Sequence, residues 1–316
     1  MESEKIVKAL KEGRLYEAKG LITKEIDMLS DEELKEVLEV AEEKAREYED
    51  LELYKIVTYY YAEFLGIDKL VEFEEFARKK GFEGLMELAD LYDLLGFPEK
   101  ALETYREILK NERDPEKLGE AYFGIATVHE ELQEYDKALE MIKKTIENLE
   151  KSTNREKLLR AKIYEGYLIF EAGEKVKAKE KLARLLPEVP RGELKAQIHL
   201  AFEEIFEDEE NYEAAMQECL YALLEARGTN FFEIAFDSLV DLIWQLMLED
   251  DFEEIYNSMP MFKAAIPEFE GFFEGVRRIA LYKDGKIGRE DVSEIITKVK
   301  DERLASILEF LGEAEL

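Results

Sequence analysis

The sequence predicts an all-α protein in which one unit, two antiparallel helices joined by a tight turn, is repeated along the chain. Apolar residues recur at helical spacing in nearly every long segment, whereas no convincing run of strand-like alternation occurs. Within 84–186, small residues return at a fixed offset of twelve positions. The three pairs are Ala89 and Ala101, Ala126 and Ala138, and Gly166 and Ala178.

Each later alanine has a bulkier apolar residue four positions on, namely Tyr105, Ile142 and Leu182. A small residue at a helix crossing lets two backbones approach closely, and the residue four further on lies one turn along the same face. These alanines are therefore expected to mark the helix crossings. With a fourth one added, they are spaced 37, 40 and 37 residues apart: Ala101, Ala138, Ala178 and Ala215.

Turn and capping residues place the helix ends. Gly13, Gly96 and Gly173 each precede a packing alanine by five residues, and glycine adopts the left-handed conformation that ends helices at little steric cost. Ser30 and Glu33 have the spacing of a capping box, which predicts a helix from there to about residue 48.

The chain is predicted to form one continuous solenoid in three parts. Divergent helix pairs occupy 1–80, regular repeats occupy 81–226, and divergent helices with a cap occupy 227–316. In the fourth pair, Ala201 is taken as the small residue of the first helix, which leaves about two extra residues before the turn. Further on, a helix is expected over 231–248 and a shorter one over 252–259, ended by Pro260.

The formal net charge of −32 limits the partners. A surface this acidic repels phosphate backbones and anionic lipid, so neither nucleic acid nor membrane is expected as a partner. Two interpretations of the charge remain open: it keeps many solvated helix faces soluble, or it suits a basic partner.

No catalytic, metal-binding or cofactor-binding pattern is found, so no enzyme activity, metal or cofactor is expected. Cys219 is the only cysteine and follows Ala215 by four residues, so we expect it in the core. His129 and His199 lie on different repeats and are interpreted as core or rim residues. The opening residues lack the basic flank and apolar core of a signal peptide, which favours a cytoplasmic location.

The repeated block resembles the tetratricopeptide repeat, whose signature runs W-x2-L-G-x2-Y, then A-x3-F, then P. The resemblance covers about 84–225 and rests on three copies with identical internal spacing. The first copy has Leu85, Leu88, Ala89, Tyr92, Ala101 and Tyr105; the second has Tyr122, Ile125, Ala126, Tyr135, Ala138 and Ile142; the third has Gly166, Ala178 and Leu182.

This resemblance implies a right-handed superhelix whose first helices line a concave groove for a peptide or partner helix. Members of the family are mostly adaptors without chemistry of their own. One subclass holds a C-terminal carboxylate with Lys, Arg and Asn on the inner helices, and the Asn is expected directly after the small residue. Here Asp90, Thr127 and Tyr167 stand at those positions, so the sequence departs from that clamp.

The groove-facing positions are expected three before, one after and four after each small residue. The candidate partner-binding residues are Met86, Asp90, Asp93, Phe123, Thr127, Glu130, Tyr167, Phe170 and Trp244. The same rule also selects Ile163, Ile198, Phe202, Ile205, Val240 and Met247. Such a groove, acidic at one end and aromatic or aliphatic at the other, suits a basic or amphipathic segment of another protein.

Two functional hypotheses follow, with an enzyme as a distant third because no site for chemistry is visible. The first is a non-catalytic protein-interaction adaptor or scaffold that binds a partner in this groove. The alternative is a homo-oligomer joined through the aromatic-rich stretch 231–273, because a terminal repeat without a polar cap can pack on a second copy. For each aromatic, filling core between helices is the competing interpretation.

Overall fold

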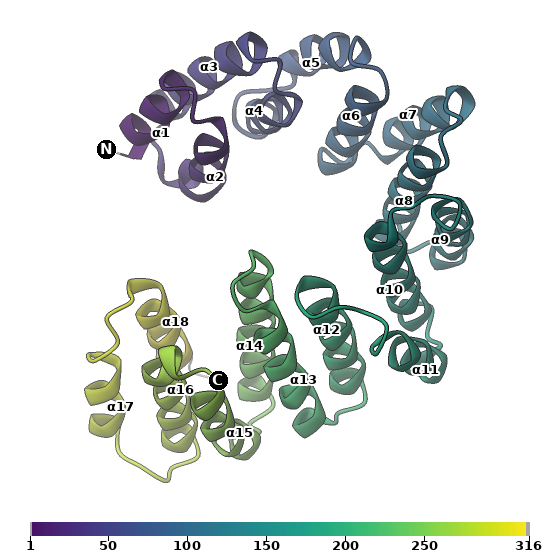
Figure 1. Cartoon of the computed structure of the whole chain (residues 1–316). Helices are drawn as coiled ribbons and strands as arrows, with labels where there is room; N and C mark the ends of the chain where they lie inside the picture. The colour runs from purple at the N-terminus through teal and green to yellow at the C-terminus, as the bar shows by residue number, and fades with distance from the viewer. Residues whose placement is uncertain (1, 314–316) are drawn as a thin grey trace. The chain divides into compact units, whose positions relative to one another are not determined.

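The computed structural model describes residues 2–313, apart from the side chains of residues 2, 296 and 313, and it is helical throughout (Figure 1). Between residues 2 and 313 there is no strand, which confirms the predicted all-α fold. The N-terminal elements are α1 (Glu2–Lys11), α2 (Leu15–Glu25), η1 (Ile26–Met28), α3 (Asp31–Glu47), α4 (Leu51–Phe64), α5 (Asp68–Arg78), α6 (Phe82–Leu94), α7 (Pro98–Asn111), α8 (Pro115–Glu131) and α9 (Tyr135–Leu149). They are followed by α10 (Arg155–Glu171), α11 (Lys175–Leu185), α12 (Glu193–Asp208), α13 (Tyr212–Ala226), α14 (Phe231–Leu248), α15 (Phe252–Ala265), η2 (Pro267–Phe269), α16 (Glu270–Lys283), α17 (Arg289–Ile296) and α18 (Glu302–Glu313).

The helices form two compact units, 1–161 and 162–316, and the boundary falls within α10. Each unit has its own hydrophobic core. In unit 1 the helices pack on their neighbours in sequence, as α6 does on α7 and α8 on α9; in unit 2, α12 packs on α13 and α15 on α16. Nearest-neighbour packing of this kind is the hallmark of a helical repeat. The three-part division of the chain and the right-handed superhelix stay predictions.

Local sequence signals start several helices as expected. The Ser30 side chain accepts from the backbone N–H of Glu33, and the Glu33 carboxylate accepts from the Ser30 N–H at 3.1 Å, so the predicted capping box is confirmed. At the start of α8, the Asp114 carboxylate accepts from the backbone N–H groups of residues 116 and 117, and Pro115 occupies the first helical turn. Both devices satisfy N–H groups that an N-terminal turn leaves unpaired.

One backbone feature repeats through the chain between paired helices. A residue in the left-handed conformation ends the first helix five positions before the packing residue of the second. These residues are Gly96, Gln133, Gly173, Glu210 and Asp250. Glycine accepts the conformation freely, whereas the other three adopt it with a side chain present, so the turn is imposed by the packing of the helix pair rather than by glycine alone.

The packing alanines lie at the helix crossings, as predicted. Ala101, Ala138, Ala178 and Ala215 are fully buried. The third pair shows the contact directly, because a Cβ placed on Gly166 would lie 2.6 Å from Leu182 Cδ2. The small residue of the first helix therefore faces the residue four positions after the packing alanine, and α10 and α11 approach so closely at residue 166 that a Cβ there would require Leu182 to shift.

Two expectations about helices are wrong. Pro260 lies inside α15, which continues to Ala265 instead of ending near residue 259. In the fourth pair, the left-handed residue is Glu210, and the position seven residues before it is Glu203, not Ala201. A buried glutamate therefore occupies the slot that holds alanine or glycine in the three preceding pairs.

The crossing can be tested at Gly166. We expect Gly166→Ala to lower the free energy of unfolding by roughly 1–3 kcal/mol, because the new methyl group overlaps Leu182. Gly20→Ala is the matched control: Gly20 lies within α2 with nothing within 4 Å of an added Cβ, so alanine should be neutral or stabilise by up to about 1 kcal/mol. Denaturant unfolding of both variants measures these changes in the free energy of unfolding. Equal changes in the two variants would show that residue 166 does not lie at a close helix crossing.

Candidate functional site

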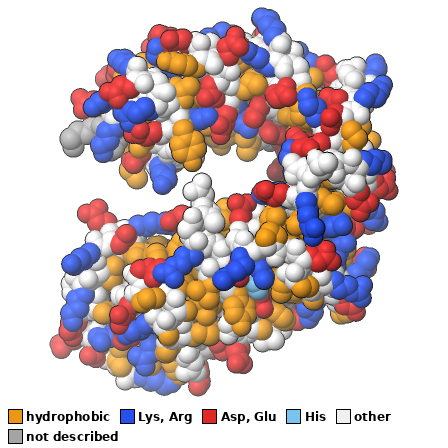
Figure 2. Space-filling view, in the orientation of Figure 1, with side chains coloured by type: hydrophobic (Ala, Val, Ile, Leu, Met, Phe, Trp, Pro, Cys, Tyr) orange, Lys and Arg blue, Asp and Glu red, His pale blue; other side chains and the backbone are white. Residues whose placement is uncertain are grey.

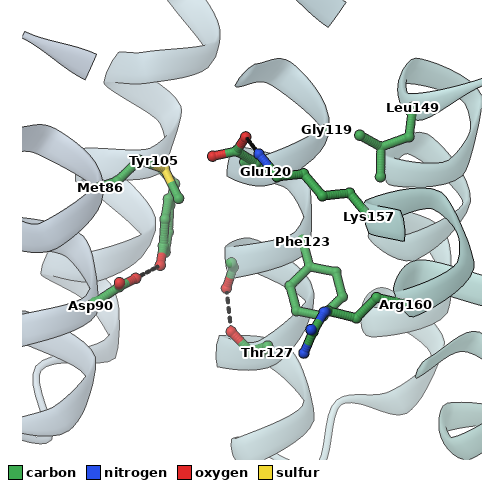
Figure 3. Close-up of a pocket in the computed structure, with 11 residues that line it drawn as sticks. Met86, Asp90, Tyr105, Gly119, Glu120, Phe123, Thr127, Leu149, Lys157 and Arg160 are labelled. Atoms are coloured by element: carbon green, nitrogen blue, oxygen red, sulfur yellow. Dashed lines mark hydrogen bonds and ion pairs between the residues drawn. The ribbon is translucent and has the colours of Figure 1, made fainter. Parts of the chain in front are cut away.

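A cavity of about 400 Å³ lies in unit 1 between α6, α7, α8, α9 and the start of α10 (Figure 3). Its lining residues are Met86, Asp90, Tyr105, Gly119, Glu120, Phe123, Gly124, Thr127, Leu149, Lys157 and Arg160. Most of the wall is apolar, and the polar side chains converge from two sides. Ligand sites in proteins commonly combine these two features.

Two glycines of α8 give the cavity its depth. A Cβ on Gly124 would lie 2.4 Å from Cζ of Tyr105, and a Cβ on Gly119 would lie 2.8 Å from Cγ of Leu149. The Tyr105 ring and the Leu149 side chain therefore rest directly on the α8 backbone. Any larger residue at 119 or 124 would displace these side chains into the space.

Asp90 and Tyr105 form the polar contact on the α6 side of the cavity. The Tyr105 hydroxyl donates to Asp90 Oδ1 at 2.5 Å (Figure 3). Burial, with the adjacent Asp90 carboxylate as the next cause, raises the pKa of Tyr105, so the hydroxyl remains a donor. Asp90 also lies 3.8 Å from Lys55 Nζ on α4, which places a cation beside this carboxylate.

Cations line the opposite side. The Lys157 ammonium contacts the carboxylates of Glu116, at 2.8 Å, and Glu120, both on α8. The Arg160 side chain lies beside the Phe123 ring in Figure 3. Arg160 also lies 3.8 Å from the Glu156 carboxylate. This side of the cavity therefore carries cations that are paired with carboxylates, over an apolar floor.

Asp93 lies three residues after Asp90 on α6, and it is half-buried. Burial raises the pKa of Asp93 to about 6, and the negative charges of Glu131 and Asp90 add to this effect. A cation placed near Asp93 would favour its ionised form. This part of unit 1 therefore holds a carboxylate whose charge changes close to neutral pH.

Four of the nine predicted groove residues come together in this cavity: Met86, Asp90, Phe123 and Thr127. Asp93 and Glu130 lie on the same two helices but outside the lining, and both are partly exposed.

Tyr167, Phe170 and Trp244 belong to unit 2 and are also partly exposed. The Tyr167 ring stacks on Tyr164 at 6.0 Å, and the Trp244 ring lies 4.7 Å from Phe310 of the C-terminal helix α18.

The prediction missed the cations and the glycines of the cavity. Gly119 and Glu120 lie seven and six residues before Ala126, and Arg160 lies six before Gly166. Extending the inward-facing positions by one more turn toward each helix start would have selected them. Tyr105 and Leu149 come from second helices, which were not considered as part of the groove.

Five of the additionally selected positions are wrong: Ile163, Ile198, Phe202, Ile205 and Met247 are buried in the core. In α12 the error follows from the wrong small residue. With Glu203 in that slot, the same rule selects Leu200, Glu204 and Glu207, which are all partly or fully exposed. The positions that the rule selects in the fourth pair are therefore mostly acidic rather than aromatic or aliphatic.

Many aromatic residues of 231–273 fill the core of unit 2. Phe236, Phe252, Phe262, Phe272 and Phe273 are buried. Phe231, Phe232, Phe269 and Trp244 are partly buried and pack against the same core. The self-association hypothesis therefore has fewer exposed aromatics to act through than the sequence suggested.

The histidines and the cysteine lie in the interior. His129 Nδ1 is 2.7 Å from Glu134, and His199 Nδ1 is 2.6 Å from Glu218. Cys219 is buried, as predicted. Across residues 2–313, no three His, Cys, Asp or Glu side chains are grouped so as to hold a metal ion. Over the same residues, no helix combines the length and apolar character needed to span a bilayer.

Comparisons with known proteins give fold-level likeness only. No family model matches the chain, and no curated protein matches it. The chain is similar to BtubC (BKLC) from P. vanneervenii, with 16% identity, a TM-score of 0.46, and coverage of 70% of this chain and 93% of that one.

Two further solved structures share this likeness. The Cut9–Hcn1 hetero-tetramer of the APC/C matches with 14% identity and a TM-score of 0.46, over 88% of this chain and 52% of that one. The apo form of RapI matches with 13% identity and a TM-score of 0.43, over 98% of this chain and 96% of that one. All three TM-scores are below 0.5, so the helical-repeat fold is assigned from the chain's own helices.

The polar contact in the cavity gives a testable prediction. Tyr105→Phe should lower the free energy of unfolding by roughly 1–2 kcal/mol, because the hydroxyl that donates to Asp90 is lost from a buried site. Thermal or denaturant unfolding measures the change. Tyr16→Phe on exposed α2 removes the same hydroxyl and should leave stability unchanged. A Tyr105→Phe variant as stable as the wild type would show that this bond contributes nothing.

Proposed function

We propose that the chain is a non-catalytic adaptor of the tetratricopeptide-repeat kind, which takes an apolar side chain of a partner protein into the unit 1 cavity. The observation that carries this proposal is the cavity itself, which is lined in part by residues of the successive first helices α6, α8 and α10. The three repeat copies with identical spacing support the family likeness.

The lining residues specify what the partner presents. Met86, Phe123 and Leu149 offer apolar contacts, and a cavity of about 400 Å³ has room for a long aliphatic or aromatic side chain. An anchor of this kind, held in a desolvated pocket, typically supplies most of the binding energy of an interface.

The charged residues around the cavity favour one orientation of a bound partner segment. Asp90 and Asp93 suit a basic residue next to the anchor on the α6 side. We therefore propose a partner with an amphipathic segment, basic toward α6. Tyr167, Phe170 and Trp244 of unit 2 stay separate candidate partner-binding residues of that unit.

The cavity is tested by filling it. Thr127 lines the cavity, and its hydroxyl donates to the backbone carbonyl of Gly124 at 2.8 Å. Thr127→Trp places a large ring in the space, so partner affinity should fall at least tenfold, which corresponds to about 1.4 kcal/mol. The partner is first captured from native lysate at low salt and identified by mass spectrometry, and its affinity is then measured by calorimetry.

A matched control distinguishes blockage of the cavity from a general effect of adding a tryptophan to the protein. Thr23 on α2 is exposed, and its hydroxyl donates to the carbonyl of Lys19 in the same way. Thr23→Trp adds the same ring away from the cavity and should leave affinity unchanged. Equal affinity in the two variants, or recovery of the bait alone as a multimer, would reject the cavity as the binding site.

The Asp93 carboxylate predicts a pH dependence of binding. Its raised pKa of about 6 means that the free protein gains a negative charge here as pH rises through that value. A basic partner binds the ionised form better, so affinity should rise roughly two- to fivefold between pH 5 and pH 7. Asp93→Asn, measured by calorimetry at both pH values, should abolish the rise; a rise that persists in this variant would remove Asp93 from the proposal.

A further inference from the structure

Glu203 is a carboxylic acid in the interior of unit 2, only 3% exposed. It lies on α12 seven residues before the left-handed residue Glu210. Ala89, Ala126 and Gly166 hold the same position before their own left-handed residues. A residue type that is almost never fully buried without a partner thus replaces a small one at a helix crossing.

The space for Glu203 comes from the residue that it faces. In the third pair, Gly166 lies against Leu182. In the fourth pair the corresponding residue of the second helix is Cys219, which is fully buried and much smaller than leucine. Compared with the third pair, the larger of the two residues is on the first helix instead of the second. The side-chain volume at the crossing is therefore similar, but the crossing now contains a titratable group.

Glu203 joins three helices. Ser238 Oγ on α14 donates to Glu203 Oε2 at 3.0 Å, and the Cys219 thiol on α13 interacts with the same carboxyl group. A change in the charge of this group therefore acts on α12, α13 and α14 together.

The charged groups around Glu203 are predominantly acidic. Glu204 and Glu207 of α12 act on Glu203 directly, and Glu207 is in turn acted on by Asp241 of α14 and by Glu249, which follows α14. Glu218 of α13 is paired with His199, and Lys175 and Lys179 of α11 pair with Asp208 and Glu209. Within residues 2–313, no Lys or Arg forms an ion pair with Glu203, Glu207 or Asp241.

A carboxylate in these surroundings is costly because it lacks both water and a counter-charge. Burial raises the pKa of Glu203 to about 8; the hydrogen bond from Ser238 opposes this shift, and the charges of Glu204 and Glu207 add to it. Burial likewise raises the pKa of the Cys219 thiol. Both groups are therefore neutral in the closed interior at neutral pH.

We propose that the junction of α12, α13 and α14 is a pH-dependent joint, held closed while Glu203 is a neutral acid and released as its carboxylate ionises in the opened form. When the junction opens, Glu203 reaches water and returns to its ordinary pKa of 4.5. Opening therefore releases a proton at any pH between 4.5 and about 8, and the opening equilibrium rises by up to tenfold for each pH unit across that window. Below the window both forms are protonated, and above it both are ionised, so the equilibrium is flat.

This window includes the physiological range. A partner that requires the closed arrangement of α12 and α14 would bind unit 2 more tightly as pH falls. The joint belongs to unit 2 and does not depend on the cavity of unit 1, so the two proposals stand or fall separately.

Cys219 provides the readout. It is the only cysteine of the chain and is fully buried beside Glu203, so a thiol reagent modifies it only when the junction opens. The modification rate of the full-length protein is measured between pH 5.5 and 8 for the wild type and for Glu203→Gln, which keeps the shape and stays neutral. Thiol ionisation accelerates both proteins alike, so the ratio of the two rates isolates Glu203.

We expect the ratio of wild-type to Glu203→Gln rates to rise by up to tenfold per pH unit up to about pH 8. Ser238→Ala removes a hydrogen bond but keeps the acid, so its rate should follow the wild-type pH slope. Glu203→Ala, which introduces the residue found in this slot of the second repeat, serves as a second neutral variant should Glu203→Gln fail to fold. A ratio that stays constant within twofold across this range, with either neutral variant, overturns the proposal.

Discussion

The crossing of paired helices at a small residue is the constraint on which the rest of this structure depends. Two helices approach closely only where one contributes almost no side chain, and the facing residue then fills the space. Gly166 against Leu182 shows the contact with the small residue on the first helix. In the next pair the larger residue, Glu203, lies on the first helix, and the smaller one, Cys219, lies on the second. The side-chain volume at the crossing is therefore kept, but one of the two side chains is now a carboxylic acid.

The same constraint shapes the cavity of unit 1. The Tyr105 ring follows its packing alanine by four residues and lies against Gly124 of the next first helix. A glycine at that point admits a ring and leaves a hollow beside it, whereas the slot at Ala126 is closed. The candidate site is therefore a by-product of how one repeat packs on the next, with polar groups added at its rim.

Much of the fold could be predicted because it is encoded locally. Helical periodicity, the capping box at Ser30 and the packing alanines each act within a few residues, and each is confirmed. The register of the fourth pair could not be read, because Glu210 adopts a left-handed conformation that glycine usually marks. Because no glycine marks this turn and a glutamate occupies the position of the small residue, Ala201 was chosen as the nearest small residue. The three groove positions that were counted from Ala201 are wrong for this reason.

The candidate site was predicted only in part for a similar reason. The spacing within one first helix is enough to predict four lining residues, because the direction of a side chain follows from its position along that helix. These residues are Met86, Asp90, Phe123 and Thr127. Tyr105, Leu149 and Lys157 enter the cavity from other helices, and their approach depends on inter-helix distances that the glycines of α8 decide. Sequence spacing alone carries no information on such distances.

Net charge and local chemistry are separate properties of this chain. Figure 2 shows acidic and basic side chains interspersed on both units, and many are paired between neighbouring repeats, as Arg78 is with Glu107 at 2.7 Å and Lys179 with Glu209 at 2.6 Å. Pairs of this kind at the surface contribute little stability each. Asp93 and Glu203 differ because burial, more than neighbouring charge, raises their pKa values toward neutrality. The two carboxyl groups most able to respond to pH are therefore those that helix packing has removed from water, and the charge of −32 does not identify them.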